Sequence, residues 1–416
     1  MSADERYICA FPGRRDAYQV PVALAEHSRL ELFLTDFYWS GPVAWAGEKM
    51  LDGNRLRKAR GRQAPAIPPA RVRVLWSSSA RRKVDELRGW PPGLRYSLEG
   101  IRFAEAARDA ARLHRAHLFL YPPGSHEAFT ASYPRHQPRR VLFQFHPHPG
   151  YQERVLRADA DTYPEVAASF REESWRDLPP ALQARDADGW RDADLIFCAS
   201  SFTRDTLLEA GADPGRCRVV CYGVDSPSET AGDLPPPRPG FHALFVGTGL
   251  QRKGLHHLLA AWKTATMPAD SSLTIVARHH DPGLSEILAA SPRTTLLAGG
   301  ISAERLRALY AESTLFVMPS LLEGFGAVYL EAMCRGCPVL GTARTCLPDI
   351  GTENEGVFLA PVADSTALAG RLEELAGRLP GNLALRRRAA DRAAGFTWER
   401  FRRELVGALD HRDGHD

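Results

Sequence analysis

The sequence contains no run of about 18 apolar residues, the length that crosses a membrane as a helix, so we expect no membrane-spanning segment. The first residues, MSADERYICAFPG, are acidic and polar before they become apolar, which is the wrong order for a secretory signal. Seven cysteines are an odd number for a disulfide framework, and most of them fall in apolar, strand-like runs. We therefore expect a cytoplasmic chain with free thiols.

Lysine is scarce, because the chain has five lysines against forty-eight arginines. The net charge is only +3, yet residues 51–100 hold twelve Lys and Arg against four Asp and Glu, a local excess of +8. Such a segment is either a solvated surface or a patch for anionic lipid headgroups or an acidic acceptor. In the second case the protein would sit peripherally at the inner membrane surface. The segment carries no nucleic-acid-binding motif, so we expect no nucleic acid partner.

A chain of 416 residues has the length of two domains. Short apolar runs that resemble strands alternate with helical patterns, at residues 6–11, 30–35, 72–76, 117–122, 140–145, 194–200 and 217–223, and again at 242–247, 273–278, 294–300, 314–320, 338–343 and 356–361. The Pro- and Gly-rich residues 228–240 between the two series predict a linker. Alternation of this kind predicts an α/β chain with two doubly wound, Rossmann-like domains.

The stretch SLLEGFGAVYLEAMCRGCPVL, residues 320–340, places Glu323 in a glycine-rich turn and Glu331 in the helix that follows. Gly324 and Gly326 allow a ligand to approach the backbone closely, and a helix N-terminus attracts anions. A carboxylate inside the helix would accept hydrogen bonds from hydroxyl groups such as those of ribose. The spacing therefore fits an elongated ligand with a nucleoside, a pyrophosphate and a polyol, although a surface acid and an acid near an N-cap explain it equally well.

This stretch closely resembles the E-x7-E signature of the family-4 retaining glycosyltransferases, which adopt the GT-B fold. Residues 197–225, 245–262 and 396–401 resemble the family's segment that closes the first domain, its phosphate loop and its terminal helix. The resemblance implies two Rossmann-like domains facing across a cleft. It also implies a nucleotide-diphospho-sugar donor, an acceptor of unknown kind (a glycan, a lipid-linked molecule or a small molecule), retention of anomeric configuration, and neither metal nor other cofactor.

The resemblance also divides the chain into domains. Residues 1–228 would form the acceptor-binding domain, and residues 240–396 would form the domain that binds the nucleotide-sugar. The terminal helix, residues 397–412, would pack back on the first domain, with Thr397 as its N-cap.

The family's donor contacts can be transferred to this sequence residue by residue. Glu323 would contact the transferred sugar, and the amides of Gly324, Phe325 and Gly326 would hold the sugar and the phosphate. Glu331 would hold the ribose. Glu323 is therefore a candidate catalytic residue.

The phosphate loop departs from the family pattern. Gly247 ends the strand, but the arginine that usually follows it is Thr248 here. Lys253 matches the family's lysine before a glycine and is a second candidate catalytic residue, while Arg252 beside it would supply the missing charge. If the loop is extended, neighbouring side chains point to opposite sides and only one of the two cations would face the diphosphate, in which case we expect it to be Lys253.

In the first domain, His146 stands at a strand end, where the family often has a histidine near the sugar, and it is the third candidate catalytic residue. A satisfied loop histidine is an equally good interpretation, and His148 is the alternative. Gly13 follows the first strand at the position of the family's acceptor loop.

Other motifs are weaker. Asp159 and Asp161 match the pattern of a metal-binding D-x-D pair, but such pairs arise by chance in a sequence rich in Ala and Asp. Cys334 and Cys337 resemble half of a zinc or redox site without a second pair of ligands. GTGLQRKG lacks the third glycine of a dinucleotide loop, which argues against a dehydrogenase. A nucleotide-sugar epimerase or hydrolase on the same fold is the other alternative to a glycosyltransferase.

Overall fold

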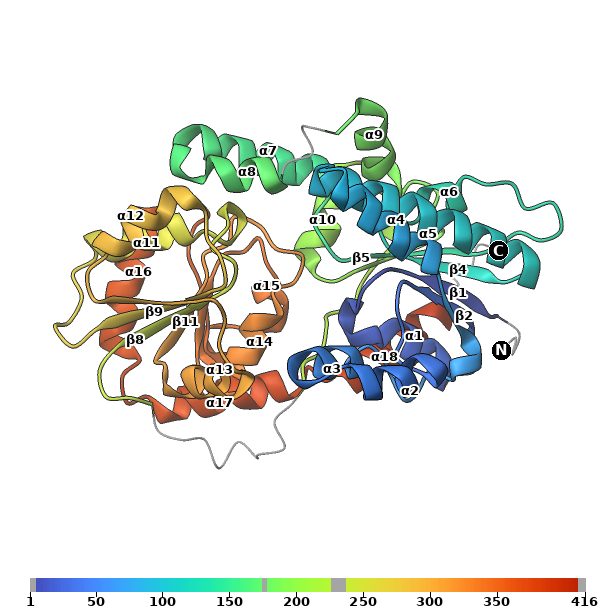
Figure 1. Cartoon of the computed structure of the whole chain (residues 1–416). Coiled ribbons are helices and arrows are strands. Elements are labelled where there is room, and N and C mark those ends of the chain that lie inside the picture. Colours follow the sequence, from blue (N-terminus) through green and yellow to red (C-terminus); the bar gives the residue numbers. More distant parts are fainter. Residues whose placement is uncertain (1–4, 174–177, 226–236, 411–416) are drawn as a thin grey trace.

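The computed structural model describes residues 5–173, 178–225 and 237–410, and it contains two parallel β-sheets (Figure 1). The first sheet has seven strands in the order β3-β2-β1-β4-β5-β6-β7. Their bounds are β1 Tyr7–Ala10, β2 Leu30–Thr35, β3 Val72–Val74, β4 His117–Leu120, β5 Arg140–Gln144, β6 Leu195–Cys198 and β7 Cys217–Val219. Every neighbouring pair in this sheet is parallel.

The second sheet has six parallel strands in the order β10-β9-β8-β11-β12-β13. Their bounds are β8 His242–Val246, β9 Ser272–Ala277, β10 Thr294–Ala298, β11 Leu315–Val317, β12 Val339–Gly341 and β13 Val357–Leu359. All the runs expected from the sequence thus form strands, and each predicted run contains its strand except at β9, which begins one residue earlier. Alternating apolar runs and crossover helices identify a parallel sheet because both of its faces are covered.

Helices cover both faces of each sheet (Figure 1). In the first domain they are α1 Gln19–Glu26, α2 Gly41–Met50, α3 Gly53–Arg60, α4 Trp76–Leu87, α5 Pro92–His114, α6 His126–Phe129, α7 Pro149–Thr162, α8 Ala167–Glu173, α9 Pro180–Asp188 and α10 Ser201–Glu209. In the second part they are α11 Leu255–Thr264, α12 Ser285–Ala290, α13 Ala303–Glu312, α14 Ala327–Met333, α15 Leu347–Ile350, α16 Ser365–Arg378, α17 Leu383–Ala394 and α18 Trp398–Asp410. Among the described residues, none of these helices combines the length and apolar character that a membrane crossing requires.

The strand order fixes where a ligand can bind. In each sheet the order reverses beside the first strand of that domain, between β1 and β4 and between β8 and β11. Doubly wound sheets bind ligands at such switch points, beyond the carboxyl ends of the strands. The loops that follow β1, β8 and β11 carry Gly13, Gly247 and Gly324, which places these predicted site residues at the switch points.

The last helix returns to the first domain, where the red α18 lies beside the dark blue α1 (Figure 1). Arg402 donates hydrogen bonds to Glu26 at 2.8 Å and to Gln19 at 2.6 Å. The Thr397 hydroxyl accepts a hydrogen bond from the amide of Arg400 at 3.1 Å, which confirms Thr397 as the N-cap. The predicted helix end at residue 412 lies outside the described residues, as does most of the predicted linker.

The chain therefore passes between the domains twice, and the two passages touch. The amide of Val224 donates to the carbonyl of Phe396 at 2.9 Å, and Val224 pairs with Thr397 in a parallel bridge. Next to this contact, the ring of Tyr222 packs against Phe325 of the second domain and Trp398 of α18, with ring centroids 5.3 and 5.8 Å apart. An apolar core thus continues from one domain into the other.

Candidate functional site

The loop after β11 lies directly against the first domain. A Cβ atom on Gly324 would overlap the carbonyl oxygen of Phe145, so only glycine fits there. The hydroxyls of Ser200 and Thr203 donate to the carbonyl of Gly324 at 2.6 and 3.0 Å. Both hydroxyl groups belong to the start of α10 in the first domain, so the turn that carries Glu323 is held between the two domains.

Glu323 is buried, with 6% of its surface exposed, and it forms ion pairs with both cations of the phosphate loop. Lys253 Nζ lies 2.8 Å from Glu323 Oε1, and Arg252 Nη1 contacts the same oxygen. An extended loop would turn only one cation inward, but both cations reach Glu323 here. Residues Gln251–Lys253 form the 3-10 turn η6 instead of an extended loop, so neighbouring side chains need not point to opposite sides.

His146 follows β5 and faces the same cations from the first domain. Burial among protein atoms, together with the positive charges of Arg252, Arg15 and Lys253, holds the pKa of His146 well below its usual value. His146 as a whole residue is exposed, so a ligand can reach it although protein atoms surround it. At neutral pH it is an uncharged imidazole with hydrogen-bonding capacity.

Arg15 is a site residue that the sequence analysis missed. It lies in the loop after β1, and its guanidinium stacks on the ring of Phe145, with its central carbon 3.8 Å from the ring centroid. The next residues, Asp16, Ala17 and Tyr18, all have positive φ angles of 46°, 48° and 65°. Such conformations are costly for residues other than glycine and concentrate at functional sites. The only sequence signal was the place of this loop at the end of the first strand.

The second glutamate of the signature lies on α14, as predicted. The hydroxyl of Tyr310 donates to Glu331 Oε2 at 3.2 Å, and Glu331 as a whole residue is exposed. Burial raises the pKa of Glu331, and the hydrogen bond from Tyr310 partly offsets that effect. Phe325 is 3% exposed and packs in the core, while Gly326 provides a left-handed turn with φ of 87° before the helix.

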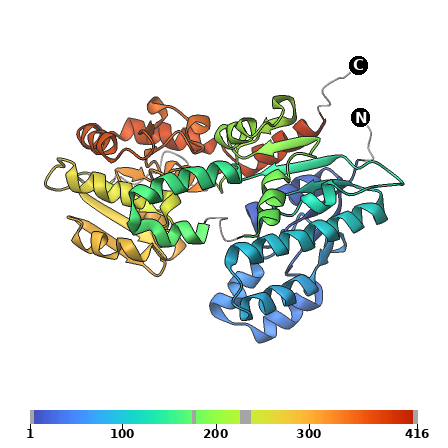
Figure 2. The same cartoon turned by 90° about the horizontal axis from the view of Figure 1, so that it is seen from above.

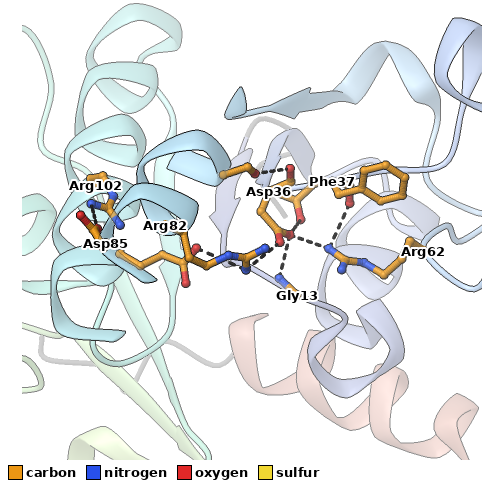
Figure 3. A network of polar contacts seen from close by, with 10 residues as sticks. Gly13, Asp36, Phe37, Arg62, Arg82, Asp85 and Arg102 are labelled. Carbon is orange, nitrogen blue, oxygen red and sulfur yellow. Dashed lines mark hydrogen bonds and ion pairs between the residues drawn. The ribbon is translucent and has the colours of Figure 1, made fainter. Parts of the chain in front are cut away.

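The loop of Gly13 is fixed by a buried carboxylate at the end of β2 (Figure 3). The amide of Gly13, whose φ is 81°, donates to Asp36 Oδ1 at 2.8 Å. Arg62 forms an ion pair with the same oxygen, and Arg82 Nη1 lies 3.3 Å from Oδ2. Asp36 is 2% exposed and joins the segment after α3, the middle of α4 and the first-strand loop into one unit.

Comparison with known proteins identifies the second domain. Residues 240–378 match the family model described as glycosyl transferases group 1. The second domain belongs to the group 1 glycosyl transferases. Among curated relatives, the MMP alpha-(1->4)-mannosyltransferase of Mycolicibacterium hassiacum is 30% identical over 190 residues, which are 43% of this chain and 45% of that protein. The chain spans about half the length of the curated relatives it matches.

Solved structures establish the fold of the whole chain. Sucrose-phosphate synthase from Thermosynechococcus elongatus superposes with a TM-score of 0.66 at 17% identity and covers 97% of this chain and 98% of its own. HepE from Anabaena, solved in complex with UDP and glucose, gives a TM-score of 0.57 at 13% identity, with 97% and 99% covered. The chain has the GT-B fold, as the resemblance predicted.

A pocket of about 200 Å³ opens beside His146 on the first-domain side. Pro122, Pro123, Phe145 and Tyr96 give it apolar and aromatic walls, and Gln144 and Asp186 are among its polar residues. His148 does not face it as a free ligand, because it caps α7, with its side chain accepting from the amide of Gly150 at 3.2 Å. Of the two histidines, His146 is thus the one that faces the cations.

Asp159, which the sequence analysis dismissed as a chance residue, is buried between the domains. Its carboxylate contacts Nε2 of His256 at 3.0 Å and Nε2 of His257 at 2.7 Å, both at the start of α11 in the group 1 domain. Burial opposes ionisation of Asp159, but the hydrogen bonds from the two histidines and from Gln251 outweigh it and hold its pKa well below the usual value. Three such side chains can also hold a metal ion, but contacts of 2.7–3.0 Å are those of hydrogen bonds.

The seven cysteines are all buried and free. Burial raises the pKa of Cys334 to about 11 and that of Cys337 to about 12, so neither is a reactive thiolate at neutral pH.

Proposed function

We propose that the chain is a retaining glycosyltransferase that moves a sugar from a nucleotide-diphospho-sugar to an acceptor hydroxyl without a metal ion. The observation that carries this proposal is the junction of Glu323 with Arg252 and Lys253, opposite His146 and at the contact between the domains. The group 1 match of the second domain supports it. Among relatives, a mannosyltransferase and the UDP complex of HepE support a nucleotide-sugar as the donor.

The two cations suit a departing diphosphate. Arg252 and Lys253 share one carboxylate, so the cluster keeps a net positive charge in a site that is largely shielded from water. A diphosphate would compete with Glu323 for these cations and would release the carboxylate to accept hydrogen bonds from sugar hydroxyls. Fixed positive charge at the point where negative charge develops is the largest common source of catalysis.

The remaining groups fit the two ends of the donor. Glu331 and Tyr310 would bind the ribose hydroxyls, because a carboxylate accepts from a vicinal diol and the phenol fixes its orientation. Neutral His146 would accept from or donate to a hydroxyl of the transferred sugar without repelling the cations around it.

The acceptor would bind in the pocket beside His146 and the loop of Gly13. In the transfer, the bond between the anomeric carbon and the diphosphate oxygen breaks, and a bond to the acceptor oxygen forms on the same face. The acceptor proton passes to the departing phosphate oxygen, so no enzymic nucleophile is required. Arg15 would add positive charge on the first-domain side of the cleft.

We further propose that the first domain contacts an anionic membrane through residues 41–100, which include the basic segment 51–100. Of ten large apolar residues exposed among the described residues, six lie here, and they are Trp45, Met50, Trp76, Val84, Leu87 and Tyr96. Exposed aromatic residues among Lys and Arg are typical of surfaces that lie on anionic lipid. Asp36 ties this region to the Gly13 loop, so the acceptor side of the cleft borders the proposed contact.

The donor proposal is tested by thermal unfolding with UDP-, GDP-, ADP- and dTDP-sugars. A donor at about 100 times its dissociation constant stabilises the protein by about 2.7 kcal/mol. Glu331→Ala should weaken binding of the free nucleoside diphosphate by about 1.5–3 kcal/mol, whereas Glu323→Ala should spare it and damage turnover. No stabilisation by any donor would overturn the proposal, and donor breakdown without acceptor would identify a hydrolase. Activity should persist in EDTA, and the anomeric configuration of the product should match that of the donor.

A further inference from the structure

An arm of the first domain reaches over the second. It consists of α7, the 3-10 turn η3 (Pro164–Val166) and α8, which lie between β5 and β6 in the sequence. In Figures 1 and 2 its green helices leave the first domain and lie beside the yellow helices of the second. The arm therefore sits on the face that carries the phosphate loop.

Asp159 of the arm binds the segment that carries the two site cations. Gln251, the first residue of η6, donates from Nε2 to Asp159 Oδ2 at 2.8 Å and to the carbonyl of Leu156 at 2.7 Å. His256 and His257, on the next helical turn, also donate to the carboxylate. Arg252 and Lys253 lie between these contacts in the chain, so the arm holds their backbone on both sides.

The arm also holds the other flank of the phosphate loop. Ser169 on α8 donates to Asp281 Oδ2 from its hydroxyl at 2.7 Å and from its amide at 2.5 Å. The amide of Asp281 in turn donates to the carbonyl of Gly249 at 3.0 Å, inside the loop. A Cβ on Gly283 would overlap the carbonyl of Glu165, so η3 packs directly on this segment.

A small apolar cluster joins the arm to the signature turn. Leu156 and Phe170 of the arm pack with Leu321, which is 1% exposed and stands two residues before Glu323. The amide of Leu321 donates to the carbonyl of Arg252 at 3.0 Å. The arm thus contacts both loops whose side chains form the Glu323 cluster.

We propose that this arm is a clamp that keeps the diphosphate-binding loop in its closed arrangement, with Asp159 as its positioning residue. The inference rests on the proposed function, because it assigns a role to the loop that would bind the donor's diphosphate. Asp159 touches none of the groups that would contact the ligand. If the domains move apart while the arm stays with the first domain, Asp159 loses its hydrogen bonds to the side chains of Gln251, His256 and His257. The clamp therefore lowers the rate at which bound diphosphate escapes.

The test is the affinity of the intact protein for UDP, GDP, ADP and dTDP, measured by calorimetry, with the dissociation rate of the tightest measured by stopped flow. Asp159→Asn should weaken that affinity about tenfold, the size expected when hydrogen bonds to a charged group are lost, and the change should lie in the dissociation rate. Asp161→Ala, on the exposed side of the same helix, is the matched control and should bind as the unmodified protein does. A merely structural role would lower the melting temperature and leave the dissociation constant of the folded protein unchanged.

A second variant tests the clamp if Asp159→Asn does not fold. Ser169→Ala removes the hydroxyl bond to the Asp281 carboxylate on the other flank but keeps the amide bond to the same oxygen, so it should weaken binding about threefold. Unchanged affinity in folded Asp159→Asn, or in Ser169→Ala if the first does not fold, overturns the clamp. Stoichiometric zinc held by Asp159 and the two histidines would also overturn it. If the unmodified protein binds no nucleoside diphosphate, the proposed function fails and the clamp fails with it, whereas equal binding by the folded variants removes the clamp alone.

Discussion

Two regions of this protein are rich in positive charge, and they differ in what surrounds that charge. In the cleft, the side chains of Arg252 and Lys253 are 18% and 14% exposed and meet one buried carboxylate. On the first-domain surface, Lys83 and Arg60 are 66% and 55% exposed and each pairs with its own exposed glutamate. Water and salt screen the second kind of charge but hardly reach the first. We therefore expect strong, local anion binding in the cleft and weak, salt-sensitive binding at the surface.

The largest effect should come from removing a cleft cation. Lys253→Ala should lower turnover of the sugar donor about 100-fold, the loss typical of one preorganised group that stabilises developing negative charge. Arg252→Ala should cost less, since Lys253 is the residue that matches the family pattern. Initial rates with saturating donor measure both.

Lys263→Ala is the matched control, because Lys263 lies exposed on α11, the helix that follows the loop. A greater loss in Arg252→Ala would mean that the arginine, not the lysine, acts on the leaving group. Equal rates in all three variants would show that the cations of the cleft contribute no more to turnover than an exposed surface lysine does.

A smaller effect is expected at the surface. Flotation with vesicles that contain anionic lipid should recover the protein, and about 1 kcal/mol of that binding should be lost for each Lys or Arg removed near the lipid. The double variant Arg57→Ser, Lys58→Ser should therefore bind about 30-fold more weakly at low salt. Trp45 is 65% exposed, and Trp45→Ser should also weaken binding to the vesicles.

Leu383→Ser is the control for the apolar change, since Leu383 is 58% exposed on the second domain. Equal recovery with neutral vesicles, or recovery that does not fall as salt rises, would contradict the membrane proposal and leave residues 51–100 as a solvated surface.

The smallest effect concerns the dependence of stability on pH. Burial lowers the pKa of both His148 and His256. Below a pH of about 6.5 the unfolded chain protonates these residues while the native state keeps them neutral, so the free energy of unfolding falls as the pH falls. Burial raises the pKa of Asp16 to about 6, which acts in the opposite direction between about pH 4 and 6.

Urea unfolding at pH 7.5 and 5.5 should show a net loss of about 1 kcal/mol. His256→Gln should make the free energy of unfolding depend less on pH. Anion binding in the cleft should remain stronger and less salt-sensitive than anion binding at the surface. Constant or rising stability on acidification would show that the histidines are not held neutral.

The sequence predicted the strands well because each is a short apolar run between helical patterns, a local signal. It also located Glu323, Gly324 and Glu331, because their spacing along one turn and one helix fixes their relative places. It could not find the Asp159 network, whose partners His256 and His257 stand 97 and 98 residues away in the sequence.

The conformation of the phosphate loop could not be predicted from the sequence for a related reason. Whether Gln251–Lys253 is extended or turned depends on what holds it, and the holding groups come from the arm and from the segment after β11. Arg15 was missed because its stacking on Phe145 joins the ends of two strands that are far apart in the sequence. These roles follow from tertiary contacts that a local pattern does not encode.

The two passages of the chain between the domains have a mechanical consequence. Val224 and Thr397 lie side by side and are bonded as in a parallel sheet, and a Cβ on Gly223 would overlap the second passage. Two adjoining segments make a ribbon, and a ribbon folds about the line across its width far more readily than it bends within its own plane. The domains should therefore open by a hinge motion about that line, so that Glu323 and His146 move directly apart and do not slide past each other.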